Sequence, residues 1–268
     1  MKKFGLLGKN INYTYSPILH NKIFEVYNIE GDYEIFNLEN ESQIYNFLKI
    51  LKKEKTIGIN VTIPYKTSIL KYVDIISPEV LSIGAANCIK FENEKIIAYN
   101  TDYFGVLKTF EKMGLDLKNK KVIVLGSGGA AKATIKALLD SKAIVYLVSR
   151  NKIKAQKEFE NIFFLSYEEL VNSSGYLIIN ATPVGTFPDT DISPVSSEIL
   201  QNFDFALDLI YNPEETQFLK YAKSKGKKVE NGLYMLIAQG VKSEEIWNNL
   251  EFNYEKIYND LIDIIHKK

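Results

Sequence analysis

Residues 122–131 have the sequence Val-Ile-Val-Leu-Gly-Ser-Gly-Gly-Ala-Ala, an apolar run that leads into the pattern Gly-x-Gly-x-x-Ala. The apolar run predicts a buried strand, and the composition of residues 130–139 predicts a helix directly after the glycines. In dinucleotide-binding folds the glycines allow a tight turn and a close backbone approach, and the helix N-terminus receives the pyrophosphate. We therefore expect a Rossmann unit here, while a glycine-rich turn without a ligand stays open on this pattern alone.

The next apolar run, residues 144–148, is followed by Ser149-Arg150-Asn151-Lys152. At this distance from the glycines, NAD enzymes carry an Asp or Glu that binds the ribose hydroxyls, and this chain has no carboxylate there. Arg150 is the one arginine among 33 basic residues. Its guanidinium is a planar fork that matches a phosphate, and Lys152 and Lys154 add positive charge nearby. The segment predicts a 2'-phosphate site and hence NADP, and the alternative is a solvated surface arginine.

The composition indicates a globular protein that acts on a small molecule. The 268 residues are 46% hydrophobic and carry a formal net charge of zero, with the lysines spread along the chain. This distribution favours neither nucleic acid nor an anionic membrane as a partner, and no apolar stretch is long enough to span a bilayer. We expect a cytoplasmic protein. Cys88 is the single cysteine, which excludes an internal disulfide and predicts buried packing, and His20 and His266 are too few for a zinc cluster.

The order of elements predicts an α/β fold with two domains, because short β-branched runs alternate with helical patterns along the chain. We expect residues 1–101 and 237–268 to form an N-terminal α/β substrate domain, and residues 102–236 to form the NADP-binding Rossmann domain. The pattern of the tail from Leu233 predicts helices that pack back on the first domain. Ser16-Pro17 predicts a helix start, with Ser16 as the cap. The expected strands are 3–7, 32–38, 57–61, 87–91, 95–99, 122–125, 144–148, 162–165, 176–180, 205–209 and 227–229.

Lys66 and Asp102 are the candidates for proton transfer. A nicotinamide oxidoreductase that acts on an alcohol needs a proton shuttle at the carbinol oxygen. Lys66 follows a polar strand end, residues 58–65, and Asp102 closes Asn100-Thr101-Asp102 at a strand-to-helix junction, where loop residues commonly converge on a cleft. From the residues alone, a surface lysine and a helix-capping aspartate remain open.

The chain resembles the shikimate dehydrogenase family from end to end, through separated motifs in the family's order. The resemblance implies an NADPH-dependent, reversible reduction of 3-dehydroshikimate to shikimate in aromatic amino acid biosynthesis, with Lys66 as general acid/base together with Asp102. The motifs that carry the resemblance are residues 8–21, 60–66, 84–87, 100–102, 126–131, 149–151, 180–185, 208–213 and 231–236.

The resemblance also implies the residues that bind the two ligands. Those expected to bind the substrate are Thr14, Ser16, Asn60, Thr62, Asn87, Tyr211 and Gln239. Those expected to bind the cofactor are Gly126, Ser127, Gly128, Gly129, Ala130, Ser149, Arg150, Asn151, Lys154, Ala181, Thr182, Gly232 and Met235. No metal is expected, and the protein is expected to be a monomer or a homodimer.

Two of the departures from the family pattern in the first motif bear on the substrate. Thr14 stands where the family usually has serine, and Tyr13 replaces a common histidine. The threonine keeps a hydroxyl, but its extra methyl narrows the pocket, so a quinate/shikimate dehydrogenase of relaxed specificity is an alternative. The second alternative is a non-catalytic NADP-binding sensor.

Overall fold

The computed structural model describes residues 1–11 and 14–265, with side chains described as far as residue 262. Tyr13 and His266 therefore lie outside the described residues. The chain divides into two compact units: unit 1 is Met1–Gly105 with Ile237–Lys268, and unit 2 is Val106–Leu236. The predicted bounds of the substrate domain and of the NADP-binding domain remain a prediction, because a division into compact units does not assign a function to either unit.

Unit 1 contains a mixed sheet, which in the described residues has the order β2-β1-β3-β5-β6-β4. β1 is parallel to β2 and β3, whereas β5 is antiparallel to both β3 and β6. Asn93 and Glu94, both with positive φ, form the two-residue turn between β5 and β6, which confirms the predicted hairpin. The strands are β1 (Lys2–Gly8), β2 (Gly31–Asn37), β3 (Gly58–Val61), β4 (Ile75–Ile76), β5 (Cys88–Glu92) and β6 (Lys95–Tyr99).

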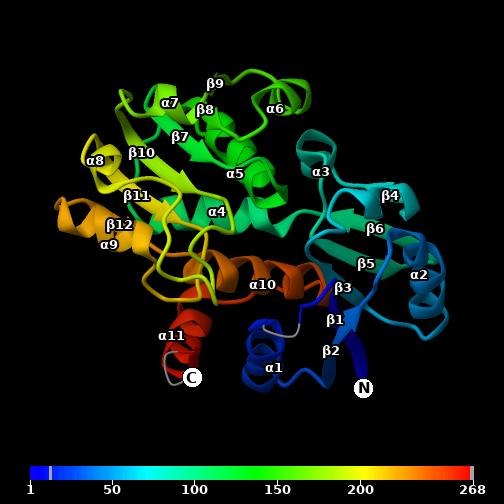
Figure 1. Cartoon of the computed structure of the whole chain (residues 1–268). Helices are drawn as coiled ribbons and strands as arrows, with labels where there is room; N and C mark the ends of the chain where they lie inside the picture. Colours follow the sequence, from blue (N-terminus) through cyan, green and yellow to red (C-terminus); the bar gives the residue numbers. More distant parts are fainter. Residues whose placement is uncertain (12–13, 266–268) are drawn as a thin grey trace. The chain divides into compact units, whose positions relative to one another are not determined.

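The helices of unit 1 are α1 (Ser16–Tyr27), η1 (Glu41–Gln43), α2 (Ile44–Lys53), η2 (Ser68–Tyr72), α3 (Pro78–Ile83) and α11 (Tyr254–Ile265), with the larger part of α10 (Leu233–Asn248). Of these, α1, α2, η2, α3 and α10 contribute apolar residues to the clusters on this sheet (Figure 1). α1 begins one residue before the predicted start, so Ser16 lies inside the first turn and Tyr15 occupies the cap position. The expectation that Ser16 caps this helix is wrong.

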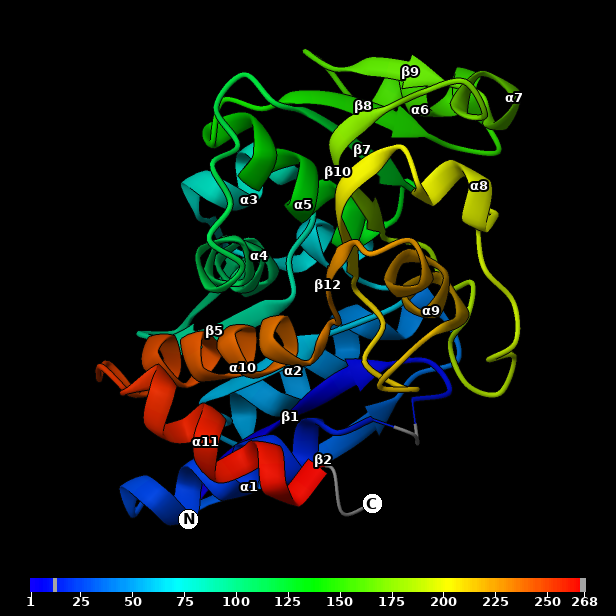
Figure 2. The ribbon, with the colours of Figure 1, turned by 90° about the vertical axis from the view of Figure 1, so that its left-hand side faces the viewer.

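The C-terminal helices pack on unit 1, as predicted. The indole Nε1 of Trp247 in α10 donates to Ile89 O at 2.9 Å, and a Cβ at Gly58 would lie only 2.1 Å from that nitrogen. α11 lies beside α1 in both views of the ribbon (Figures 1 and 2). Cys88 belongs to the same apolar cluster and is fully buried, which confirms its packing role, and burial raises the pKa of its thiol.

Unit 2 is built on a parallel sheet, which in the described residues has the order β12-β11-β10-β7-β8-β9. Its strands are β7 (Lys121–Leu125), β8 (Ile144–Val148), β9 (Phe163–Leu165), β10 (Gly175–Asn180), β11 (Phe203–Asp208) and β12 (Lys228–Glu230). This is the doubly wound order of dinucleotide-binding folds, whose ligand site lies where the order reverses, here between β7 and β10. The predicted fold class is therefore confirmed.

The helices of unit 2 are α5 (Gly129–Asp140), α6 (Lys152–Glu158), α7 (Tyr167–Leu170), α8 (Ser197–Leu200) and α9 (Gln217–Ser224), and α4 (Thr101–Lys112) runs across the boundary between the units. None of the helices in the described part of the chain is both long and apolar enough to cross a membrane.

Candidate active site

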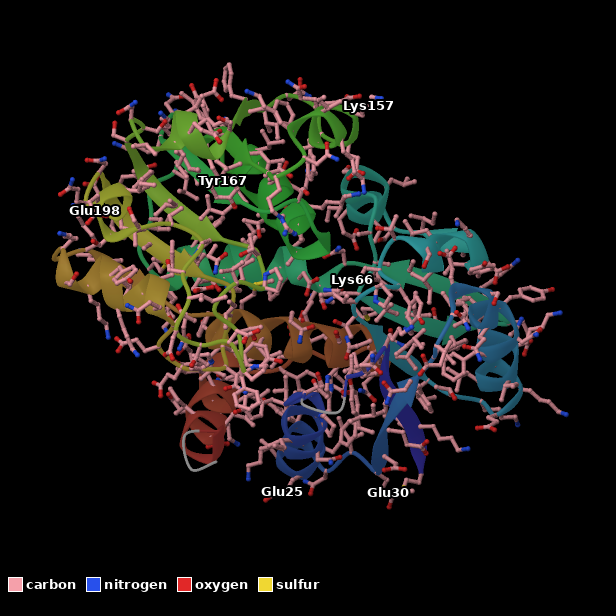
Figure 3. All side chains as sticks on the ribbon, in the orientation of Figure 1. Glu25, Glu30, Lys66, Lys157, Tyr167 and Glu198 are labelled. Carbon is pink, nitrogen blue, oxygen red and sulfur yellow. The ribbon has the colours of Figure 1, made fainter. Side chains whose placement is uncertain are left out.

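Lys66 and Asp102 form an ion pair inside unit 1. The Lys66 Nζ donates to Asp102 Oδ2 at 2.5 Å, and the two side chains are only 16% and 8% exposed. Lys66 comes from the segment after β3, where Figure 3 labels it, and Asp102 from the first turn of α4. Burial of two charges is stabilised only by their pairing and by further hydrogen bonds. An ammonium group has three donors, of which the contact with Asp102 uses one.

Asn87 holds the other oxygen of this carboxylate. Its Nδ2 lies 2.9 Å from Asp102 Oδ1 and also faces Thr101 Oγ1 at 3.0 Å and Gln239 Oε1 at 3.2 Å. Its Oδ1 accepts from Thr101 N at 2.6 Å. The start of α4 is thus fixed by a neighbouring amide, and Asp102 receives a donor on each oxygen.

The Ser243 hydroxyl joins this group to Asn60. It accepts from Asn60 Nδ2 at 2.9 Å and lies 3.1 Å from Thr101 Oγ1, and the Oδ1 of Asn60 accepts from the Tyr33 phenol at 2.8 Å. Burial raises the pKa of Tyr33 well above its usual value, which keeps the phenol a donor. Both ends of the Asn60 carboxamide are used within unit 1.

Sequence reasoning missed Thr101 and Ser243 as members of this group. Thr101 sits inside the Asn100-Thr101-Asp102 motif, and Ser243 follows Gln239 by four residues on α10, so both lie next to residues that were identified. The helical spacing was the signal that could have found Ser243.

Thr14 and Ser16 bring two hydroxyls together at the start of α1. Thr14 Oγ1 donates to Ser16 Oγ at 3.0 Å and accepts from Ser16 N at 3.1 Å. Thr62, half-buried, follows β3, and its amide donates to Leu7 O at 2.8 Å. These three hydroxyl-bearing residues lie at the carboxyl ends of β1 and β3 or just beyond, where ligands of parallel sheets commonly bind.

The glycine-rich turn of unit 2 fits a dinucleotide. Gly126 has φ of +99°, and a Cβ there would lie 2.8 Å from Thr182 Cγ2, so a larger residue is excluded. A Cβ at Gly128 would meet no atom within 4 Å, so a side chain would fill space that the pattern reserves for a close backbone approach. Gly129 and Ala130 open α5, whose first turn carries no acidic residue to oppose a pyrophosphate.

Arg150 follows β8 with its guanidinium exposed. Within the described residues, no carboxylate comes within ion-pair distance of it, whereas Lys152 pairs with Glu169 at 3.0 Å and Lys154 with Glu158 at 3.7 Å. The Ser149 hydroxyl lies 3.4 Å from that of Ser127. Asn151 caps α6, because its Oδ1 accepts from Lys154 N at 2.9 Å. This geometry leaves the arginine as the cation best placed for a phosphate.

The loops after β10, β11 and β12 carry the other expected contacts of unit 2. Ala181 and Thr182 directly follow β10, and the backbone amide and hydroxyl of Thr182 both donate to Asn180 Oδ1, at 3.0 and 2.7 Å. Tyr211 lies in the loop after β11, and Gly232 N donates to Ile210 O at 3.0 Å. Gly232 admits no side chain, since a Cβ would lie 2.1 Å from Leu209 O.

Among the described residues, no group of three or more His, Cys, Asp or Glu side chains could hold a metal ion. Unit 1 contains a largely buried lysine–carboxylate pair. Unit 2 contains a glycine-rich turn, followed by an exposed arginine, that suits a dinucleotide with a 2'-phosphate. Together they define an α/β protein with the residues of an NADP-linked oxidoreductase.

Comparisons with known proteins give the particular family. Residues 6–89 match the model of the shikimate dehydrogenase substrate binding domain, and residues 113–229 match a putative NAD(P)-binding model. The chain is 44% identical over 268 residues to the shikimate dehydrogenase (NADP(+)) of Clostridium perfringens, covering 97% of this chain and 98% of the relative. The chain belongs to the shikimate dehydrogenase family.

Solved structures agree. A chorismate mutase/shikimate 5-dehydrogenase fusion protein from Clostridium acetobutylicum gives a TM-score of 0.96 at 40% identity, covering 100% of this chain and 98% of the other. The shikimate 5-dehydrogenase from Thermus thermophilus, in complex with NADP(H) and shikimate, gives 0.88 at 32% identity, covering 97% and 98%. These findings confirm the predicted family, its oxidoreductase class and NADP as the family's cofactor. The roles of individual residues stay predictions.

Proposed function

We propose that this chain reduces 3-dehydroshikimate to shikimate with NADPH, reversibly, with Lys66 as the general acid/base and Asp102 as its partner. The single observation that carries the proposal is the buried Lys66–Asp102 pair, with a 2.5 Å contact, in the unit that matches the family's substrate binding domain. We also propose that residues 1–101 with 237–268, which lie in unit 1, form the substrate domain. Residues 102–236, which comprise unit 2 and the segment 102–105, would form the NADP domain.

The proton transfer follows from the ion pair. The hydride for the ring carbonyl carbon would come from bound NADPH, and in the reverse direction it would go to NADP+. Lys66, in its ammonium form, donates a proton to the carbonyl oxygen, so the C=O group becomes CH–OH and the lysine becomes a neutral amine. In the reverse direction the amine removes the hydroxyl proton. Asp102, oriented by Asn87, holds the lysine in place and accepts from a neighbouring ring hydroxyl.

The polar residues of unit 1 are proposed to hold the substrate. The Thr14 and Ser16 hydroxyls would donate to the carboxylate near the start of α1, whose N-terminus favours negative charge. The other proposed substrate contacts are Asn60, Thr62, Asn87, Tyr211 and Gln239. Because the Asn60 carboxamide hydrogen-bonds to Tyr33, Ser243 and a backbone carbonyl, Asn60 would also hold the neighbouring polar side chains in position.

The cofactor would lie on unit 2 across the carboxyl ends of β8, β7 and β10. The proposed contacts are Gly126, Ser127, Gly128, Gly129 and Ala130 for the pyrophosphate, Ser149, Arg150, Asn151 and Lys154 for the 2'-phosphate side, and Ala181, Thr182, Gly232 and Met235 for the nicotinamide side. Arg150 is the residue expected to distinguish NADP from NAD. We further propose a cytoplasmic monomer or homodimer, without nucleic acid or membrane as a partner.

The second candidate function, a dehydrogenase that accepts both quinate and shikimate, depends on how Thr14 shapes the pocket. The methyl group of Thr14 changes the shape of the carboxylate pocket relative to the serine common in the family. The remaining alternative is a sensor that binds NADP without turnover, and it gives no reason for the paired Lys66 and Asp102.

The test is a spectrophotometric assay with shikimate and quinate, each with NADP and NAD. Turnover that is fastest with shikimate and NADP is expected, and Lys66→Ala should lower kcat by about 10² to 10⁴ with a smaller effect on KM. Lys71→Ala is the matched control, because this lysine is exposed and pairs with Glu41. Normal turnover by Lys66→Ala would exclude the proton role, and NADPH binding without turnover on any substrate would favour the sensor.

A further inference from the structure

Asp208 is a fully buried carboxylate at the carboxyl end of β11. It lies opposite Asn180, the last residue of β10, in the parallel register of the two strands. Figures 1 and 2 show β10 beside β11. Its Oδ1 accepts from Asn180 Nδ2 and from Ile210 N, both at 3.0 Å, and its Oδ2 accepts from Thr216 Oγ1 at 2.6 Å. All three of these donors are neutral.

Through Asn180, the carboxylate reaches the segment 181–184. The carboxamide of Asn180 accepts from the amide and the hydroxyl of Thr182 on its oxygen, and donates from its nitrogen to Val184 O at 3.2 Å. The shape of the segment that contains Ala181 and Thr182 is therefore set by a side chain that is itself held by Asp208.

Through Ile210 and Thr216, the same carboxylate reaches the segment 209–216. The bond from Ile210 N fixes the turn that leads directly into Tyr211, and Thr216 closes the segment by capping α9, where its hydroxyl accepts from Leu219 N at 3.3 Å. Ile210 O also accepts from Gly232 N. Two loops of unit 2 are thus fixed by one carboxylate, and the Gly232 N–Ile210 O bond connects the segment after β12 to one of them.

The choice of a carboxylate here needs a reason beyond packing. An asparagine has one acceptor oxygen, and its NH2 group would face the Thr216 hydroxyl, which then could not donate. Only a carboxylate accepts on both oxygens from all three donors. Burial without a cation is unfavourable for its charged form and raises the pKa of Asp208 to about 6. The carboxylate therefore keeps all three donors in place, although its burial lowers the stability of the folded protein. Functional sites commonly combine these two properties.

We propose that Asp208 is a positioning residue, which holds the segments 181–184 and 209–216 in one arrangement so that the cofactor contacts of Ala181 and Thr182 and the substrate contact of Tyr211 form together. This inference rests on the proposed function, because it takes the ligands of these loops from there. Asp208 itself contacts neither ligand in this scheme.

The experiment compares Asp208→Asn, Thr216→Val and Thr216→Ser with the wild type. Thr216→Val keeps the shape and removes the hydroxyl donor, whereas Thr216→Ser restores it. Asp204→Asn is the matched control, since Asp204 lies on the same strand and is exposed. The readouts are kcat and both KM values per folded active site, and the dissociation constant of NADPH from a fluorescence titration. Misplacement of a binding loop commonly lowers kcat/KM by about 10- to 100-fold.

Asp208→Asn and Thr216→Val are expected to raise the KM for NADP and the KM for shikimate together, with kcat/KM about 10- to 100-fold lower, while Thr216→Ser and Asp204→Asn stay within about 3-fold of the wild type. Wild-type constants, a rise in only one KM, or no recovery in Thr216→Ser would overturn the proposal. If Asp208→Asn does not fold, the two Thr216 variants decide. If the wild type turns over no substrate, the proposed function fails, and NADPH affinity alone tests whether Asp208 holds the cofactor loop.

Discussion

Replacement of Asp208 by asparagine should change how the stability of unit 2 depends on pH. Burial raises the pKa of this carboxyl from an ordinary 3.8 to about 6 in the folded protein. Between these two values the folded state binds a proton that the unfolded state has released, so stability falls as pH rises through the window. A shift from 3.8 to about 6 corresponds to about 3 kcal/mol, which the wild type loses between about pH 4 and pH 6.

Asp208→Asn lacks this titration, and the other carboxyl groups titrate alike in both proteins. The free energy of unfolding of the variant, minus that of the wild type, should therefore rise by about 3 kcal/mol from about pH 4 to about pH 8. Urea unfolding at a series of pH values measures this difference. A flat line for Asp208→Asn, or a difference that falls as pH rises, would refute the assignment of the raised pKa to this carboxyl.

Three further variants test other parts of the two units. Arg150→Gln should raise the KM for NADP by about 10- to 100-fold and leave the KM for NAD nearly unchanged, because only NADP has the 2'-phosphate. The control is Lys157→Gln, which changes an exposed lysine on α6 (Figure 3). Equal effects on both cofactors would contradict the assignment of Arg150 to the 2'-phosphate. Thr14→Ser should raise the ratio of kcat/KM for quinate to that for shikimate by roughly 10-fold in parallel assays, because it removes the methyl group that narrows the pocket. An unchanged ratio would show that this methyl group does not affect substrate specificity. Ser243→Ala should lower the free energy of unfolding of unit 1 by about 1–3 kcal/mol, since it removes the acceptor of one N–H of the buried Asn60 amide and one contact of the Thr101 hydroxyl. Denaturant unfolding without any change would show that these bonds contribute nothing.

Local patterns predicted most of the fold. The glycine-rich turn and the hairpin of β5 and β6 depend on a few adjacent residues, such as Gly126 with its positive φ and the Asn93–Glu94 pair. The short elements α3 and β4 were missed, because a helix of six residues and a strand of two have too few positions for a periodic pattern. The start of α1 was misplaced by one residue, since Ser16 hydrogen-bonds locally to Thr14 and not as a cap.

The candidate site was predictable where its residues sit in motifs and not where it depends on packing. Lys66 and Asp102 were identified from their motifs, but the role of Ser243 follows from the packing of α10, well over 100 residues from Asn60 in the sequence. The role of Asp208 likewise depends on the register that places it opposite Asn180. The i, i+4 spacing places Ser243 beside Gln239, but neither the bond from Ser243 to Asn60 nor the register that places Asp208 opposite Asn180 leaves a local pattern in the sequence.

Asp102 and Asp208 show two different uses of a buried carboxylate. Asp102 has a cation on one oxygen and an amide on the other, so its charge is balanced. In the proposed function the lysine beside it exchanges a proton with the substrate. Asp208 has only neutral donors on both oxygens, so nothing balances its charge and its pKa rises. A cation beside Asp208 would occupy an oxygen that a loop now uses. The absence of a lysine among its three donors is therefore what allows one carboxylate to fix two loops, and the raised pKa is the measurable consequence.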